Sequence, residues 1–258
     1  MNTNWPPVTA QLKGFVAALQ QTLGAKLLAV YLHGSLAMGG FNPERSDIDL
    51  LVVVEPLTQL ERRELGELVL AHSNQPRPLE ISFVTPAGLA DTTYPLPLEF
   101  HFSEDWRPRF VAELADGRWQ DWFVETLRDG DLAGQIVMTL AAGITLAGPP
   151  PAELLPDIPP HVLRDSFVSD CRWALELRDE IPVYAVLNPC RTYAYLRRGL
   201  LLSKAETGRI ALELFPAEFH PLIRQASEIY AGTRPAATPF DPDLFTAFAA
   251  YLAAELNF

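Results

Sequence analysis

The sequence predicts an α/β (α+β) domain with a mixed sheet, followed by an all-α helical bundle. Short apolar runs in the first half have the length of buried strands, and they alternate with segments whose apolar residues recur every three to four positions. After Val162 the helical spacing continues almost to the end of the chain. The proline-rich stretch from Pro150 to Pro160 is typical of a connection, so we expect domains at residues 1–150 and 151–258.

Helices and strands alternate in the first predicted domain. Pro6 and Pro7 precede apolar residues at helical spacing from Val8 to Leu23, and the same spacing returns from Leu57 to His72. The other predictions for this half are strands at 27–32, 47–54 and 79–84, a short helix at 36–38, a loop at 86–97, a strand followed by a loop within 98–110, an amphipathic helix at 119–126 and an apolar helix at 131–147.

The second predicted domain is a set of helices joined by short loops, which is the pattern of an antiparallel bundle. The helices are expected at 162–178, 185–202, 204–214, 220–231 and 241–256.

The charge balance limits the classes of partner. A formal net charge of −12 argues against a nucleic-acid partner, because binding to DNA or RNA depends on Lys and Arg that neutralise phosphates. The same charge suits a cationic small molecule, although an acidic surface also serves solubility alone. Cys171 and Cys190 form no C-x-x-C motif, so we expect buried free thiols in a reducing compartment.

The sequence also bears on location. The first residues lack the basic and long apolar regions of a signal peptide, and no apolar run reaches the roughly 18 residues that a membrane span requires. We therefore expect a cytoplasmic protein with no membrane partner, and we expect it to act as a monomer.

Polar residues gather where the first two strands are joined. Gly34 and Ser35 end the first apolar run, and Ser46 lies directly before Asp47 and Asp49 at the start of the second strand. Because side chains alternate along a strand, the two carboxylates point the same way and can hold one hard cation. Gly34 allows the backbone to approach a phosphate, to which the two serine hydroxyls can donate hydrogen bonds. This pattern predicts a magnesium–nucleotide site.

Glu80 on the third strand extends this pattern. If the third strand lies beside the second, Glu80 joins Asp47 and Asp49. Three neighbouring carboxylates raise one another's pKa unless a cation is present, and bound Mg²⁺ would restore their ionised forms.

This segment resembles the signature of the polymerase-β-type nucleotidyltransferases. The signature consists of a Gly-Ser turn, a spacer of eleven residues and the triplet Asp-Ile-Asp between apolar strands. The resemblance implies that the Gly-Ser turn holds the triphosphate of ATP and that Asp47 and Asp49 bind the Mg²⁺ ions. It also supplies a third carboxylate at the place of Glu80, as a metal ligand or as the base that deprotonates the attacking hydroxyl.

Later segments narrow the resemblance. Three segments resemble, in the same order, parts of the aminoglycoside adenylyltransferases that modify streptomycin and spectinomycin. They are LEFHFSEDW, DGDLAGQIVMTLAAGITLAGPP and YAVLNPCRTYAYLRRGLLLSKAETG. This resemblance implies that Arg191 and Lys204 reach the triphosphate and that Tyr230 lies near the adenine. Gln135 occupies a place where many relatives have histidine, and it receives no role.

The same resemblance points to residues for the acceptor. Trp106 resembles a tryptophan that packs on streptomycin, and an acidic partner is expected shortly after Trp173. Glu176 and Asp179, with Glu180, are the candidates there, but the surrounding residues differ from the family's pattern.

We therefore expect an ATP- and Mg²⁺-dependent enzyme that transfers AMP to a hydroxyl of spectinomycin, streptomycin or both and releases pyrophosphate. Two alternatives remain at this point. One is transfer to another small-molecule or protein acceptor, and the other is a non-catalytic relative that only binds nucleotide. A panel of acceptors, with pyrophosphate release as the readout, separates the three.

Overall fold

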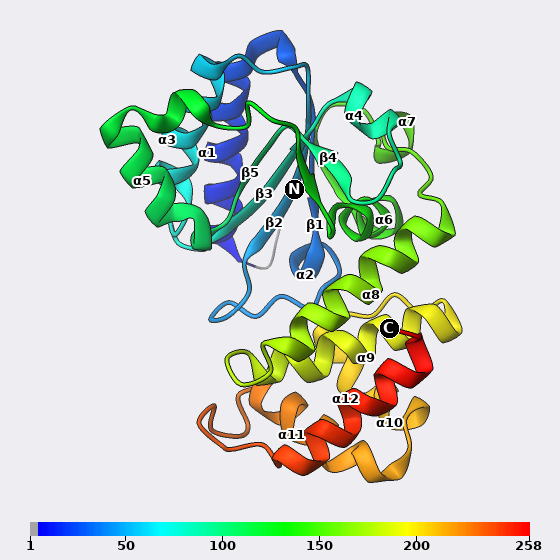
Figure 1. Ribbon diagram of the computed structural model, residues 1–258. Helices are drawn as coiled ribbons and strands as arrows, with labels where there is room; N and C mark the ends of the chain where they lie inside the picture. The colour runs from blue at the N-terminus through cyan, green and yellow to red at the C-terminus, as the bar shows by residue number, and fades with distance from the viewer. Residues whose placement is uncertain (1–4) are drawn as a thin grey trace. The chain divides into compact units, whose positions relative to one another are not determined.

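The computed structural model describes residues 5–258, which fold into two compact units (Figure 1). The first unit ends at Val162 and the second runs from Leu163 to Phe258. The sequence analysis placed the boundary at residue 150. In the structure the segment near that position stays with the first unit, where the hydroxyl of Tyr31 donates a hydrogen bond of 3.0 Å to the carbonyl of Pro149.

A mixed sheet forms the centre of the first unit. The strands are β1 Leu27–His33, β2 Ile48–Val54, β3 Leu79–Val84, β4 Leu96–Leu98, β5 Phe100–Phe102, β6 Leu127–Asp129 and β7 Ile144–Ala147. Five of them form one sheet in the order β5-β3-β2-β1-β7, while β4 and β6 form a separate pair. β2 and β3 are parallel, and all other neighbours in the large sheet are antiparallel.

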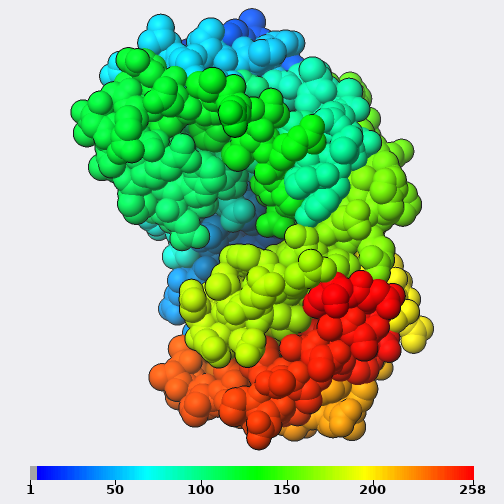
Figure 2. Space-filling view, in the orientation of Figure 1, coloured from blue at the N-terminus to red at the C-terminus, as the bar shows by residue number. Residues whose placement is uncertain are grey.

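Helices cover both faces of the large sheet (Figure 1). α1 (Pro6–Leu23) and α3 (Gln59–His72) pack together on one face, and α6 (Leu132–Ala142) contacts β1 and β2 on the other. α5 (Arg107–Asp116) packs against α3 and lies at the surface, in green in Figure 2. The remaining helical elements of this unit are α2 Gly34–Ala37, α4 Pro86–Ala90, α7 Pro151–Leu154, η1 Gly24–Lys26, η2 Glu104–Trp106 and η3 Arg118–Asp121.

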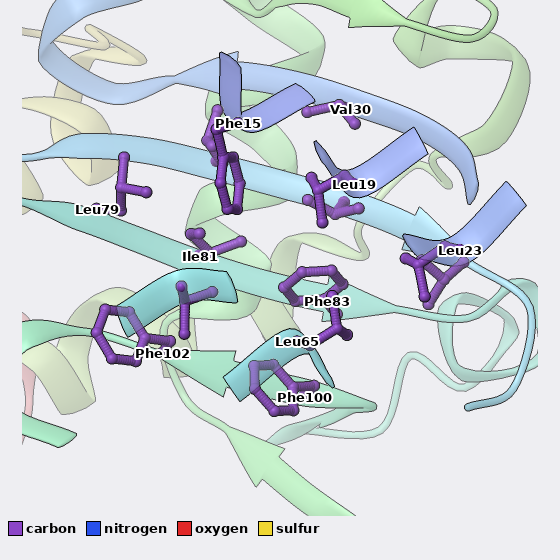
Figure 3. Close-up of a cluster of buried hydrophobic side chains, with 14 of the residues drawn as sticks. Phe15, Leu19, Leu23, Val30, Leu65, Leu79, Ile81, Phe83, Phe100 and Phe102 are labelled. Carbon is purple, nitrogen blue, oxygen red and sulfur yellow. The ribbon is translucent and has the colours of Figure 1, made fainter. Parts of the chain in front are cut away.

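The alternation of side chains along the strands separates the core from the carboxylates. Ile81 and Phe83 of β3 point to the face covered by α1 and α3, where they pack with Phe15 and Leu65 (Figure 3). The intervening side chains of β2 and β3, which include Asp49 and Glu80, point to the face of α6. The hydrophobic core is therefore closed on one side of the sheet, and the acidic groups lie on the other side.

Most sequence predictions for the strands are confirmed. β1 and β3 form where the apolar runs predicted them, and β2 begins at Ile48, so Asp47 directly precedes the strand. The helix predicted at 119–126 is wrong, because only the short turn η3 forms. Trp122 is buried there, with its ring 4.4 Å from that of Phe110, and this packing overrides the helical pattern.

Three further segments differ from the predictions. The loop expected in the later part of residues 98–110 is helical, with η2 and the start of α5, and the loop expected at 86–97 contains α4 and the start of β4. The helix predicted to reach residue 147 ends at Ala142, and β7 follows and pairs with β1. Gly143 allows this turn, because a Cβ atom there would lie 2.4 Å from the carbonyl oxygen of Thr139.

The second unit is helical, as predicted. Its helices are α8 Pro160–Glu176, which begins in the first unit, α9 Pro182–Arg198, α10 Lys204–Leu214, α11 His220–Tyr230 and α12 Pro242–Leu256, with the turn η4 Ala217–Phe219. Cys171 and Cys190 are buried free thiols in its core, in agreement with the sequence analysis, and burial raises the pKa of Cys171 to about 12. Across residues 5–258, every helix is either too short or too polar to cross a lipid bilayer.

Candidate active site

Asp49 and Glu80 lie next to each other on adjacent strands. The parallel register of β2 and β3 places Asp49 opposite Glu80, and the antiparallel register of β1 and β2 places His33 opposite Asp49. Because Gly34 follows His33, the Gly-Ser turn also lies beside Asp49. The adjacency of the second and third strands, on which the sequence argument for Glu80 depended, is confirmed.

Gly34 meets two requirements that only glycine satisfies. Its φ angle is +63°, in the left-handed region, and a Cβ atom would lie 1.9 Å from Oδ2 and 2.6 Å from Cγ of Asp49. The backbone of the turn therefore contacts the Asp49 carboxylate directly. Ser35 follows in the single helical turn α2 and is partly exposed.

The loop that leads into β2 is held by hydrogen bonds around Ser46. Its hydroxyl oxygen accepts a bond of 3.0 Å from the backbone N–H of Asn42, and its carbonyl accepts bonds of 2.8 and 3.1 Å from the Arg77 guanidinium. Asp47, the next residue, is exposed, and Asp49 is partly exposed beyond the buried Ile48. The hydroxyl hydrogen of Ser46 can still be donated to a phosphate.

Crowding of carboxylates perturbs Glu80 most. Burial raises the pKa of Glu80 to about 8, with further contributions from the negative charges of Asp49, Asp47, Asp131 and Asp129. This is the effect that the sequence analysis expected for neighbouring carboxylates, with two more acidic residues than it had considered. A cation beside these groups would favour their ionised forms.

The oxygen donors of this cluster fit Mg²⁺. Within residues 5–258 no three His, Cys, Asp or Glu side chains form a ready-made metal cage. Mg²⁺ does not need one, because it is commonly bound through one or two carboxylates together with water and substrate phosphates. Asp47 and Asp49 are the pair that would hold the ion, and Glu80 is adjacent.

A cavity of about 310 Å³ opens beside Glu80. Trp106 forms part of its wall and is fixed by aromatic neighbours: its ring stacks on Phe123 with 7° between the planes and meets His101 edge-on at 5.3 Å. The remaining lining residues are Leu98, Leu127, Arg128, Asp129, Gly130, Asp131 and Gln135.

Two buried histidines border this region and are neutral near pH 7. Burial lowers the pKa of His33 to about 4, and burial also lowers the pKa of His101, against a smaller opposing effect of Asp129. Nδ1 of His101 lies 3.2 Å from the hydroxyl oxygen of Ser82. The histidines therefore add no positive charge beside the carboxylates.

The second unit brings Arg191 and Lys204 together around one buried acid. Asp170 is close enough for both cations to lower its pKa, although burial has the larger effect and raises it. Asp170 accepts hydrogen bonds from Asn188 and from the Tyr184 hydroxyl, and the Lys204 ammonium lies 4.7 Å from the centre of the Tyr184 ring. The two cations were predicted from the sequence, but the residues that surround them in the structure were not.

The other predicted residues of the second unit are spread over different elements. Trp173 is 50% exposed on α8, and its ring meets that of Tyr184 edge-on at 6.1 Å. Glu176 ends α8 and Asp179 lies in the following turn, both exposed. Tyr230 ends α11 and packs against the hydrophobic core of this unit.

Residues 129–135 form a part of the site that was not predicted from the sequence. Asp129 ends β6, Asp131 precedes α6, and Gln135 lies in the first turns of that helix, with all three lining the cavity beside Glu80. The signal available was the second Asp-x-Asp triplet, Asp129-Gly130-Asp131. A long helix predicted from residue 131 does not by itself place this triplet near the third strand.

Comparison with known families agrees with this geometry. The family model described as "Nucleotidyltransferase domain" matches residues 11–100, which contain the Gly-Ser turn, Asp47, Asp49 and Glu80. A second family model, described as "Aminoglycoside adenylyltransferase, C-terminal domain", matches residues 153–255. The first unit therefore contains a nucleotidyltransferase domain. With both domains present in this order, the chain belongs to the aminoglycoside adenylyltransferase family.

Relatives match over most of the chain. The aminoglycoside (3'') (9) adenylyltransferase of Escherichia coli is 28% identical over 97% of this chain and 95% of its own. The spectinomycin 9-adenylyltransferase of Staphylococcus aureus is 27% identical over 83% of this chain and 82% of its own. The crystal structure of spectinomycin adenyltransferase AAD(9) from Enterococcus faecialis, solved with ATP and spectinomycin, has the same fold, with a TM-score of 0.81 at 22% identity over 97% of this chain and 99% of that chain.

Proposed function

We propose that this protein is an ATP- and Mg²⁺-dependent adenylyltransferase that transfers AMP to a hydroxyl group of spectinomycin, streptomycin or both. The observation that carries the proposal is the register that places Asp49 between the Gly34 turn and Glu80. The substrates named for the relatives in E. coli and S. aureus support the choice of acceptor.

Glu80 is the proposed general base. Its carboxylate takes the proton from the acceptor hydroxyl, whose oxygen then attacks the α-phosphorus of ATP, and the bond to the bridging oxygen breaks so that pyrophosphate leaves. Without a cation the raised pKa of about 8 keeps Glu80 mostly protonated near pH 7, and Mg²⁺ held by Asp47 and Asp49 would favour the carboxylate form that accepts the proton. Asp47 and Asp49 would hold Mg²⁺, which supplies positive charge to the phosphate oxygens when bound.

We propose the remaining roles on the basis of each residue's position and of the family resemblance. Gly34, Ser35 and Ser46 bind the triphosphate through a close backbone approach and hydroxyl donors. In the second unit we assign the phosphates to Arg191 and Lys204 and the adenine to Tyr230. We assign the acceptor to Trp106, Trp173, Glu176 and Asp179.

We further propose that the protein acts as a monomer in the cytoplasm. The reduced, buried Cys171 and Cys190 support a reducing compartment. Sedimentation at micromolar concentration tests the oligomeric state, and fractionation of the source cells tests the location.

The test of the reaction is pyrophosphate release with ATP and Mg²⁺, with spectinomycin and streptomycin offered separately. Asp47→Asn should abolish release, whereas Glu44→Gln, which removes an exposed charge three residues away, should not. Release with either drug identifies the acceptor class. Bound ATP without release for either drug would contradict the proposed acceptors and would favour another acceptor or a non-catalytic role.

A further inference from the structure

Three residues that line the cavity beside Glu80 have no role in the reaction described above. They are Asp129, Asp131 and Gln135. The cavity lies beside Glu80, so a molecule inside it would be adjacent to the proposed base. Its volume of about 310 Å³ is at the lower end of the range for small-molecule sites.

The strongest indication of a ligand is Gln135. Its side chain lines the cavity and is only 7% exposed, and Oε1 is buried without a hydrogen-bond partner among the described residues. A buried amide oxygen without a donor is unfavourable, so such groups are nearly always paired in folded proteins. Gln135 therefore carries a spare acceptor at the cavity wall, and rotation of its amide would present Oε1 to a group inside the cavity.

The charges around Gln135 select the type of group. Asp129, Asp131 and Glu80 all line the cavity. Arg128 also lines it, but its guanidinium forms a 2.6 Å ion pair with Asp91 and a 2.7 Å hydrogen bond with the carbonyl of Pro95. His101 is neutral near pH 7 for the reason given above. The cavity is therefore negative.

The Asp129 carboxylate is held in a defined position. Its Oδ1 accepts a hydrogen bond of 2.7 Å from the backbone N–H of Asp131, and the pairing of β6 with β4 places Asp129 opposite Leu96. A fixed carboxylate near an unpaired amide oxygen favours a ligand group that only donates hydrogen bonds and carries positive charge. An ammonium or alkylammonium group has both properties, and neither a hydroxyl nor a phosphate does.

We infer that Asp129, Asp131 and Gln135 bind an ammonium group of an amino-sugar or aminocyclitol acceptor and so orient its hydroxyl toward Glu80. This inference rests on the function proposed above, and it adds the residues of the first unit that select a cationic acceptor. The same wall would disfavour a neutral analogue, because such a molecule would not balance the negative charge of the two carboxylates.

The experiment measures binding of spectinomycin and of streptomycin by calorimetry, together with pyrophosphate release, for the full chain and its variants. Asp129→Asn keeps an oxygen that can accept from the Asp131 N–H, so the turn is preserved while the charge is lost. Gln135→Leu removes the amide oxygen, and Gln135→Glu replaces it with carboxylate oxygens. Glu125→Gln removes an exposed charge that lies four residues before Asp129 in the sequence and does not line the cavity, and it is the matched control.

We expect Asp129→Asn and Gln135→Leu to weaken drug binding about tenfold or more, since each removes a hydrogen bond to a charged donor. Gln135→Glu should bind the drugs as tightly as the wild type or more tightly. ATP affinity should stay within about twofold of the wild type in every variant, as should drug affinity in Glu125→Gln. Unchanged drug affinity in Asp129→Asn and Gln135→Leu, or a parallel loss of ATP affinity, would overturn the inference.

The two readouts separate this inference from the proposed function. If the wild type binds a drug in a manner that depends on Asp129 and Gln135 but releases no pyrophosphate, the ammonium site stands and the proposed reaction is wrong. If the wild type transfers AMP and neither variant changes drug affinity, the reaction stands and the ammonium site is wrong. A wild type that binds neither drug contradicts both.

Discussion

Gly34 is the residue at which backbone geometry and the reaction depend on each other most directly. Gly34→Ala would place a side chain in the left-handed region, which typically costs about 1–2 kcal/mol, and would also push the new Cβ into the Asp49 carboxylate. We expect a larger loss of unfolding free energy than backbone strain alone produces, together with loss of pyrophosphate release. Urea denaturation and the release assay measure the two effects.

Gly39 provides a matched control for this substitution. Its φ is +76°, but no atom lies within 4 Å of the position that a Cβ would take. Gly39→Ala should therefore show the strain without the collision and keep the carboxylates in place. Equal destabilisation and equal activity in the two variants would mean that Asp49 moves aside freely.

Glu80 links the pH dependence of stability to the reaction. Its folded-state pKa of about 8 lies above the ordinary value of 4.5, so between these two pH values the folded protein binds more protons than the unfolded protein. The contribution of Glu80 to stability is therefore complete below about pH 4.5 and is lost as pH rises through 8. In metal-free buffer, Glu80→Gln should become more stable than the wild type as pH increases, and pyrophosphate release should fall about 10²- to 10⁴-fold.

Denaturation midpoints from pH 5 to 9, compared between wild type and variant, measure this difference, and Glu125→Gln controls for the change in net charge. Added Mg²⁺ should reduce the difference at high pH, because a cation stabilises the ionised cluster. Turnover that survives in Glu80→Gln would show that Glu80 is not the base, even if the stability curves behave as expected.

At the scale of single elements, α10 shows how a local signal defines the start of a helix. Ser203 accepts a hydrogen bond from the N–H of Glu206, and the Glu206 carboxylate accepts one of 3.0 Å from the N–H of Ser203, so the two form a capping box directly before Lys204. Ser203→Ala should lower the unfolding free energy by about 1 kcal/mol. Ser103→Ala is a suitable control in urea denaturation, because Ser103 precedes η2 without a capping bond. Equal effects would mean that the box adds no stability.

An element could be predicted from the sequence when the residues that determine it lie within the element, and could not when they lie far away in the chain. The start of α10 and the strands β1 to β3 were predictable because the capping residues and the apolar runs lie within the segments themselves. β7 was not, because residues 144–147 become a strand only by pairing with β1, more than a hundred residues earlier. The turn at Trp122 likewise depends on a distant aromatic neighbour, Phe110.

The residues of the candidate site also differ in whether their signal is local or distant. Asp47, Asp49 and Gly34 were recognisable because their spacing is short, and Glu80 because it lies on the next predicted strand. Gln135 was not, since its significance comes from an unpaired oxygen that lines a cavity with Glu80. Such a property depends on tertiary packing and leaves no periodic pattern in the sequence.

At the scale of the whole molecule, the net charge of −12 acts on both substrates in opposite directions. A cationic drug is attracted to the acidic protein, whereas the ATP anion is repelled. Salt weakens both effects, because the screening length falls from about 10 Å at 0.1 M to about 3 Å at 1 M. Raising potassium chloride from about 50 to 500 mM should therefore increase the KM for the drug several-fold. The KM for ATP should fall or remain unchanged.

Initial rates of pyrophosphate release at fixed Mg²⁺, with each substrate varied in turn, give the two constants. Asp129→Asn should make the KM for the drug less sensitive to salt, because one of the charges that attract the ammonium group is gone, whereas Glu125→Gln should follow the wild type. If both KM values rise together, salt acts on the enzyme generally, and the acidic character of the chain then serves solubility rather than the capture of a cationic substrate.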